Sequence, residues 1–202
     1  MANPLIKGLR DLSVVVVHAP DEEGHGLVQH LHRIGCPVEA LWPPPAKLSG
    51  DVDVLMVVFA HEHRPAIERL LRSLRNQPVT IVAVVDYENP TTLQMVLDSG
   101  AHAVIEKPVR PFGLLTNLAL GRDIWRREVE AEQRVQKLDR KLNGMRKIGR
   151  AKSILMQTQN LSEDDAYKRL RDQAMAKRTT MEDIAVAIIN AFELLNGDAK
   201  ED

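Results

Sequence analysis

The sequence has a single cysteine, Cys36, and only 3% aromatic residues. One cysteine excludes an intrachain disulfide and a cysteine-based zinc site, and it is typical of a reducing compartment. The first residues are polar and lack the apolar segment of a secretory signal. The apolar run Val14–Val17 is far too short to cross a membrane. We therefore expect a cytoplasmic protein with no membrane partner.

The net charge of −1 conceals an uneven distribution of charge along the chain. Residues 1–110 carry 10 Lys and Arg against 13 Asp and Glu, residues 111–178 carry 16 against 9, and residues 179–202 carry 1 against 6. A basic middle segment between acidic ends suits the binding of a polyanion, although a solvated helical surface would show the same excess.

Short apolar segments alternate with amphipathic segments in the first half of the chain. The apolar segments are rich in β-branched residues and predict strands at residues 12–17, 38–42, 53–59, 79–85 and 103–105. The amphipathic segments predict helices at residues 24–34, 66–75 and 91–99. Strands alternating with helices indicate a parallel sheet covered on both faces, in a flavodoxin-like α/β domain over residues 1–120.

This layout resembles the receiver domain of response regulators. The resemblance rests on Gly100 and Ala101 before the fifth strand, and on Lys107 and Pro108 after it. Receivers hold Mg²⁺ with an acidic pair after the first strand and accept a phosphoryl group on an aspartate that ends the third strand.

The residues of this chain at those positions cannot support phosphorylation. The acidic pair falls at about His18 and Ala19, the phosphoacceptor falls at about Val58, and only Lys107 is retained. The hydroxyl position after the fourth strand falls near Val85 or Asp86. We predict a pseudo-receiver with a degenerate phosphorylation pocket.

Carboxylates and histidines near this pocket invite a metal-site interpretation. The run Asp21–Glu23 could partly replace the lost acidic pair, but without an acceptor aspartate it has no phosphotransfer to support. The histidines do not follow the spacing of a zinc motif. We expect no metal, no cofactor and no catalytic residue.

A heptad pattern begins after the α/β domain. Its positions, alternately four and three residues apart, are Ile124, Glu128, Ala131, Val135, Leu138, Leu142 and Met145. Charged residues surround this stripe, which makes it narrow for a helix packed on its own domain, although that alternative is open. We predict a parallel two-stranded coiled coil over residues 121–136, with the stripe continuing to about 145, that forms a homodimer.

Residues 138–195 read as three helices separated by two short breaks. Ser162 followed by Asp165, and Thr180 followed by Asp183, resemble capping boxes at the starts of the second and third helices. We expect a three-helix domain over residues 137–196 and a tail over residues 197–202.

This helical segment resembles the ANTAR domain, an RNA-binding module of bacterial transcription antiterminators. The matching residues are the runs 150–156 (RAKSILM) and 161–167 (LSEDDAY), followed by Leu170-Arg171 and Ala174-Met175. Ser153 stands where the family often has glycine. The whole chain, with its pseudo-receiver, resembles the antiterminators that regulate aliphatic amidase operons.

The resemblance implies a dimeric positive regulator that is not an enzyme. It would bind hairpin loops in a leader transcript and prevent termination. An amide-sensing negative regulator of the periplasmic-binding-protein type would sequester it, in place of control by phosphorylation.

The basic residues of the segment would contact this RNA. Candidate phosphate contacts are Arg146, Lys147, Arg150, Lys168, Lys177 and Arg178. Lys152, Ser153 and Arg171 lie on the family motif and are candidates for contacts within the loop, because proteins read RNA sequence mostly at unpaired bases.

The small alanines and the tyrosine of this segment could each serve either helix packing or RNA binding. Ala151 and Ala174 are small enough for close helix packing or for close approach of RNA. Tyr167 could stack on a base, but it shares a helical face with Leu170 and Ala174, so we interpret it as a core residue.

Two other functions fit parts of the sequence. Receivers are often joined to DNA-binding helix-turn-helix domains, but the third helix begins Met181-Glu182-Asp183, without the basic and amide side chains of a recognition helix. A dimeric adaptor without a nucleic-acid ligand is the other alternative.

Overall fold

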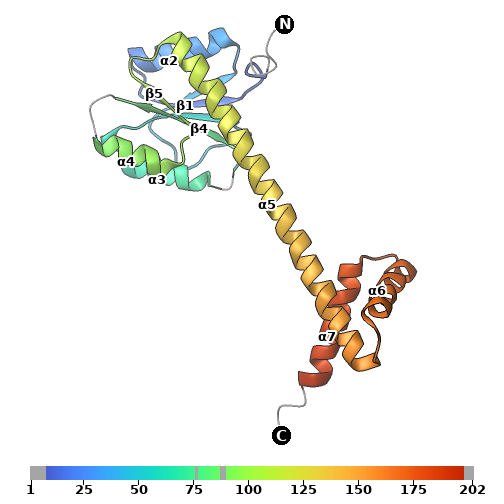
Figure 1. The fold of residues 1–202 in the computed structure, drawn as a ribbon. Helices are drawn as coiled ribbons and strands as arrows, with labels where there is room; N and C mark the ends of the chain where they lie inside the picture. The colour runs from blue at the N-terminus through green and yellow to red at the C-terminus, as the bar shows by residue number, and fades with distance from the viewer. Residues whose placement is uncertain (1–7, 76, 87–89, 198–202) are drawn as a thin grey trace. The chain divides into compact units, whose positions relative to one another are not determined.

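The computed structural model describes residues 8–75, 77–86 and 90–197 (Figure 1). Its chain forms two compact units, Met1–Val129 and Glu130–Asp202. The predicted domain boundaries near residues 120 and 136 stay predictions. No described helix is both long enough and apolar enough to cross a membrane.

A five-stranded parallel sheet forms the centre of the first unit. Its strands are β1 (Val14–Val17), β2 (Val38–Leu41), β3 (Val54–Val58), β4 (Thr80–Val85) and β5 (Ala103–Glu106). The strand order is β2-β1-β3-β4-β5. This order is that of flavodoxin-like folds, so the predicted fold class is confirmed.

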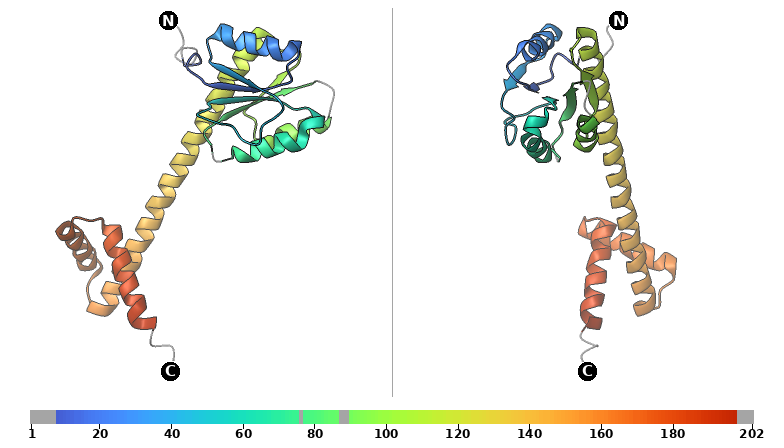
Figure 2. Two further views of the ribbon diagram at one scale, coloured as in Figure 1. Left: turned by 180° about the vertical axis from the view of Figure 1, so that it is seen from behind. Right: turned by 90° about the vertical axis from the view of Figure 1, so that its left-hand side faces the viewer.

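Helices cover both faces of this sheet, as Figure 2 shows. One face packs against α2 (Glu22–Ile34) and the first turns of α5 (Pro111–Gln159). The other face packs against α3 (Arg64–Ser73), which follows a 3₁₀ turn at His61–His63, and against α4 (Pro90–Ser99). Because both faces are covered, β1 and β3 are fully buried and consist almost entirely of apolar residues.

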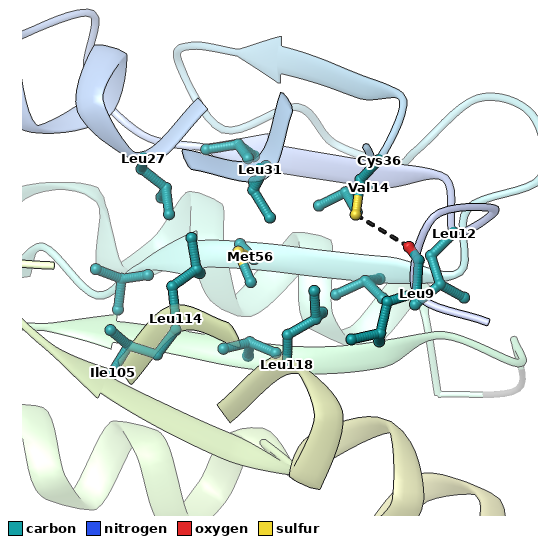
Figure 3. Close-up of a cluster of buried hydrophobic side chains, with 14 of the residues drawn as sticks. Leu9, Leu12, Val14, Leu27, Leu31, Cys36, Met56, Ile105, Leu114 and Leu118 are labelled. Atoms are coloured by element: carbon teal, nitrogen blue, oxygen red, sulfur yellow. Dashed lines mark hydrogen bonds between the residues drawn. The ribbon is translucent and has the colours of Figure 1, made fainter. Parts of the chain in front are cut away.

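Leucines from two helices fill the core on the α2 and α5 side of the sheet (Figure 3). Leu27 and Leu31 of α2 and Leu114 and Leu118 of α5 are each at most 1% exposed. The buried Cys36 thiol donates a hydrogen bond to the Leu9 carbonyl over 3.1 Å. Burial raises the pKa of this thiol, so it serves as a packing residue.

Arg122 fixes α5 to one end of the sheet. Its guanidinium donates to Asp53 Oδ1 and to Thr80 Oγ1, each over 3.2 Å, and lies 4.1 Å from the ring centre of Trp125. The preceding Gly121 allows close packing, because a Cβ there would lie 3.1 Å from Ala103 Cβ. These contacts belong entirely to the first unit.

The second unit is a three-helix domain. The last turns of α5 pack with α6 (Glu163–Lys177) and α7 (Met181–Gly197). Its buried residues are Ala151, Ile154, Leu155, Ala166, Leu170, Ala174, Ile184, Ala185 and Ile189. Four alanines in this core allow the helices to approach closely, so helix packing is the role of Ala151 and Ala174.

The predicted side-chain caps are present at the starts of α6 and α7, and the α7 cap is reciprocal because Asp183 also accepts from the Thr180 N–H. The Ser162 hydroxyl accepts from the Asp165 N–H over 3.2 Å, and the Thr180 hydroxyl accepts from the Asp183 N–H over 3.1 Å. Hydrogen bonds from Thr180 and Thr179 lower the pKa of the Asp183 carboxyl. Both helix starts therefore lie where the sequence places them.

Candidate nucleic-acid interface

The predicted RNA-binding residues of the helical unit come from the end of α5 and from α6. Arg146, Lys147, Arg150, Lys152 and Ser153 lie on α5. Lys168, Arg171 and Lys177 lie on α6, and Arg178 is the left-handed residue that ends it. All are exposed except Lys147 and Lys152, which are half-buried.

Acidic residues of the neighbouring helices pair with three of the α5 cations. Lys147 Nζ lies 2.7 Å from Glu182 Oε1, Arg150 Nη2 lies 2.6 Å from Glu193 Oε1, and Lys152 Nζ lies 2.5 Å from Glu163 Oε1. The Lys152 contact lowers the pKa of the Glu163 carboxyl. An incoming phosphate would therefore compete with a carboxylate at each of these three positions.

A glycine on α5 lies beneath one of these pairs. A Cβ at Gly144 would lie 2.8 Å from Glu182 Oε2, so the Glu182 carboxylate lies directly over this turn of α5. From there it reaches Lys147, one turn further along the helix. The sequence pattern indicates neither this contact nor the other two carboxylate partners.

The remaining candidate cations have weaker or no carboxylate partners among the described residues. Among the residues that the structure describes, Arg146, Lys168, Lys177 and Arg178 form no ion pair within 4.0 Å. Within this described part of the chain, Arg171 forms one ion pair, in which its Nε lies 3.6 Å from Oδ1 of the adjacent Asp172. These side chains extend from α5 and α6 and are available to an anionic ligand.

Helix α7 supplies no positive charge. Its sequence from Met181 to Gly197 contains no Lys or Arg, and its first turn contains Glu182 and Asp183. Glu182 pairs with Lys147, and Asp183 caps the helix. The start of α7 thus lacks the groups by which a recognition helix contacts DNA bases.

Tyr167 is not a core residue, and our interpretation of it was wrong. The buried face of α6 consists of Ala166, Leu170 and Ala174, whereas Tyr167 is 46% exposed. The side chain lies at the edge of the buried face and is only partly covered. Its ring is therefore exposed beside the basic residues of α6.

The apolar residues of the predicted coiled-coil stripe are uncovered within one chain. Ile124, Val135, Leu138, Leu142 and Met145 are between 43% and 61% exposed, and Ala131 is exposed as well. A helix packed on its own domain would bury such residues, so the structure does not favour that alternative. The coiled-coil dimer itself stays a prediction.

The degenerate phosphorylation pocket lies at the carboxyl ends of the sheet strands. His18 follows β1, with Nδ1 2.9 Å from the Ala19 carbonyl oxygen, and Val58 ends β3. His18 and Val58 are buried, and Ala19 is half-buried. The predicted acceptor position thus carries a valine side chain, which has no carboxylate, and the assignment of the pocket stays a prediction.

Lys107, the fourth pocket residue, forms ion pairs with carboxylates of this chain. Its Nζ lies 2.9 Å from Glu23 Oε2 and 3.8 Å from Asp86 Oδ1. Glu23 therefore reaches the retained lysine from the first turn of α2, near the lost acidic pair. Within the described residues, no three His, Cys, Asp or Glu side chains are grouped as a metal site.

Two residues determine the conformation at the start of α2, beside this pocket: Asp21 caps the helix, and Gly24 packs closely against the preceding loop. Asp21 Oδ1 accepts from the Gly24 N–H over 2.8 Å, and this hydrogen bond lowers the pKa of the Asp21 carboxyl. A Cβ at Gly24 would lie 2.4 Å from the Ala19 carbonyl oxygen, so only glycine fits there.

A solved receiver has the same fold as the first unit. The CheY-like response regulator receiver domain from Methanospirillum hungatei JF-1 aligns with a TM-score of 0.50 and 19% sequence identity. The alignment covers 58% of this chain and 98% of that domain. At this identity the likeness concerns the fold alone.

Family comparisons identify both units. Residues 136–189 match the ANTAR domain, which confirms the resemblance drawn from the sequence motif. Residues 12–122, more than half of the chain, match the family described as the N-terminal domain of AmiR. The chain belongs to the AmiR family. The AmiR-type match ends at Arg122, the residue that fixes α5 to the sheet.

Two relatives of this AmiR-family chain are regulators. The aliphatic amidase regulator of Pseudomonas aeruginosa is 33% identical over 189 residues, which cover 93% of this chain and 96% of that protein. The transcriptional regulatory protein PdtaR of Mycobacterium tuberculosis is 24% identical over 140 residues, which cover 69% of this chain and 68% of that protein.

Proposed function

We propose that this protein is a transcription antiterminator that binds RNA through its ANTAR unit. The observation that carries the proposal is the placement of charge on a unit matched as an ANTAR domain. Exposed cations extend from α5 and α6, whereas α7 has none. A one-sided cationic surface suits a polyanion that contacts two of the three helices.

Phosphate contacts would position the RNA on this surface. Arg146, Lys168, Lys177 and Arg178 lack carboxylate partners among the described residues, so they would contact phosphates without first breaking an ion pair. Each neutralised phosphate releases condensed counterions, so binding would weaken steeply with salt. Lys152, Ser153 and Arg171 would contact the loop, where unpaired bases expose their edges.

The uncovered stripe on α5 supports a dimer. Its apolar residues repeat alternately four and three residues apart, which is the spacing of a parallel two-stranded coiled coil. Such a dimer would carry two ANTAR units and could bind two hairpin loops of one leader transcript. The bound RNA fold would then prevent formation of a terminator hairpin.

Control would come from a partner protein. The pocket has no phosphoacceptor aspartate, and Lys107 is paired with Glu23. The relative from Pseudomonas aeruginosa is an aliphatic amidase regulator. We propose that an amide-sensing negative regulator of the periplasmic-binding-protein type sequesters this chain in the cytoplasm and releases it when amide is present. The protein makes and breaks no covalent bond in this scheme.

The test is an RNA-binding measurement on the full-length protein. RNAs with two stem-loops and randomised loop sequences are selected for binding, and the affinity of a selected RNA is measured between low and moderate salt. Lys168→Ala should lower the affinity and reduce the magnitude of the salt slope by about 1. Lys47→Ala, an exposed lysine of the first unit, is the matched control.

Duplex DNA provides the decisive comparison. The proposal predicts RNA binding that exceeds binding to duplex DNA at every salt concentration. Binding to duplex DNA alone would support the response-regulator alternative, and binding to neither would support the adaptor.

A further inference from the structure

The exposed face of α6 carries an unusual set of side chains for a surface that binds phosphates alone. Tyr167, Arg171 and Met175 are spaced four residues apart, so they lie along one stripe of the helix. Tyr167 is 46% exposed and Met175 is 71% exposed. The Tyr167 hydroxyl could contact a phosphate, but its ring and the Met175 thioether present apolar surface that a phosphate does not use.

The guanidinium between these two apolar groups is available to a ligand. The Arg171 side chain is 54% exposed, and its only ion pair with a described residue joins Nε to the adjacent Asp172 over 3.6 Å. The guanidinium is planar and can stack on an aromatic surface while it donates hydrogen bonds in its own plane. The stripe therefore combines a ring, a planar cation and a flexible apolar side chain.

Lys152 of α5 contacts the first residue of α6, Glu163, near the start of this stripe. It pairs with Glu163, which precedes Tyr167 by four residues, so the Lys152 ammonium lies one turn from the tyrosine. The opposite side of α6 differs, since the shallow hollow there is lined by Lys168, Arg169, Asp165 and Asp172 and has no aromatic residue. Only the Tyr167 side combines an exposed ring with a cation on each side.

We infer that Tyr167 stacks on one unpaired base of the bound RNA, with Arg171 beside that base. This inference rests on the proposed function. Duplex RNA hides the faces of its bases within the stack, whereas bases in a hairpin loop can turn out and stack on an aromatic side chain. The ring thus selects single-stranded loops over the duplex stem, a choice that phosphate contacts cannot make.

The test combines protein variants with altered RNA. The selected two-stem-loop RNA is prepared with each loop base removed in turn, leaving an abasic site. Full-length wild type and Tyr167→Ala are measured against every RNA, with circular dichroism to verify that the variant is folded. Tyr167→Phe keeps the ring, and Met156→Ala removes another exposed apolar residue of the same unit.

The expected result is a loss of affinity of about tenfold or more for Tyr167→Ala, and little change for Tyr167→Phe or Met156→Ala. One abasic RNA should show the same loss with wild type and no further loss with Tyr167→Ala, because both changes remove one contact. Independent, additive losses would overturn the inference. So would a Tyr167→Ala protein that binds as wild type, or one that changes only its oligomeric state.

The two proposals fail in different ways. If wild type binds no RNA, the proposed function is wrong and the stacking role falls with it. If wild type binds RNA with the expected salt dependence while Tyr167→Ala is indistinguishable from it, only the stacking role is wrong.

Discussion

His102 Nε2 lies 3.4 Å from Glu128 Oε2, and this contact accounts for the only polar residue in the heptad stripe of α5. His102 Nδ1 accepts the Ile81 N–H over 3.0 Å, so Nε2 carries the proton and faces the carboxylate. Glu128 thus interacts with its own α/β unit, and from Ala131 onward the stripe positions are apolar.

A charge in the apolar part of the stripe should break the proposed coiled-coil dimer. Leu138 is 60% exposed in a single chain, and a partner helix would bury it, so Leu138→Glu would place two uncompensated carboxylates in the seam. We expect a monomer by analytical ultracentrifugation, with unchanged helicity, at concentrations where wild type is a dimer.

Lys137, the residue next to Leu138, provides the control for the dimer prediction. Lys137 lies off the stripe, so Lys137→Glu introduces the same carboxylate and should leave the dimer intact. A wild-type protein that is monomeric at micromolar concentration would contradict the coiled-coil proposal.

The first unit should not respond to phosphodonors. Val58 cannot accept a phosphoryl group, and the retained Lys107 is already paired with Glu23. Incubation with acetyl phosphate and Mg²⁺ should therefore add no phosphoryl group, as measured by intact-protein mass spectrometry. RNA affinity should be the same before and after incubation, and phosphorylation at Asp21 or Asp86 would contradict the prediction.

Removing the α7 carboxylates that cover cations should strengthen RNA binding. Glu182→Gln and Glu193→Gln free Lys147 and Arg150 for phosphates. Exposed ion pairs contribute roughly 0.2–1 kcal/mol, so each substitution should raise the affinity about 1.5- to 5-fold and steepen the salt dependence. Fluorescence anisotropy with a labelled RNA would measure both, and unchanged affinity would show that these cations do not contact RNA.

The control for this change in charge is a glutamate substitution elsewhere in the same unit. Glu132 is exposed on α5, outside the three-helix core, so Glu132→Gln changes the net charge equally without freeing an α5 cation of the ANTAR unit. It should raise the affinity less than Glu182→Gln does.

The cap of α7 should stabilise the fold in a pH-dependent way. Because hydrogen bonds from Thr180 and Thr179 lower the pKa of Asp183, its stabilising effect is present above the ordinary carboxyl pKa of about 4 and is lost as the pH falls through the lower folded value. Asp183→Asn should lower the Tm by about 5 °C at pH 7.

This difference in Tm should shrink as the pH falls below about 4, where the wild-type carboxyl is increasingly protonated as well. Thermal unfolding followed by circular dichroism at several pH values provides the measurement. Asp164→Asn is the control, since Asp164 is an exposed first-turn residue that does not cap α6. A difference that is independent of pH would contradict the assignment to the carboxylate.

Local sequence patterns predicted the elements of this fold well. β-branched runs such as Val14–Val17 form buried strands wherever both faces of a sheet are covered, and the Ser162 and Thr180 caps act over three residues. Each of these patterns depends only on residues that are close together in the sequence. The predicted start of α2 was less accurate: this helix begins at Glu22 because Asp21 caps it, two residues before the apolar pattern indicated.

The details of the candidate site depend on contacts between distant residues. Lys152 and Glu163 are 11 residues apart, Lys147 and Glu182 are 35 apart, and Arg150 and Glu193 are 43 apart. Such pairs form only after three helices have packed. Tyr167 was misassigned for the same reason, since its position at the edge of the buried face depends on where α5 and α7 cover α6.

The carboxylates of α7 bear on competition among RNAs in the cell. Every RNA presents phosphates, so a bare cationic surface would attract ribosomal and messenger RNA in large excess over one leader transcript. Glu182 and Glu193 neutralise two of the cations that all of these RNAs would use. What matters for a regulator is the ratio of its affinity for one site to its affinity for the many competing sites. Weaker phosphate binding, which all RNAs share, raises this ratio.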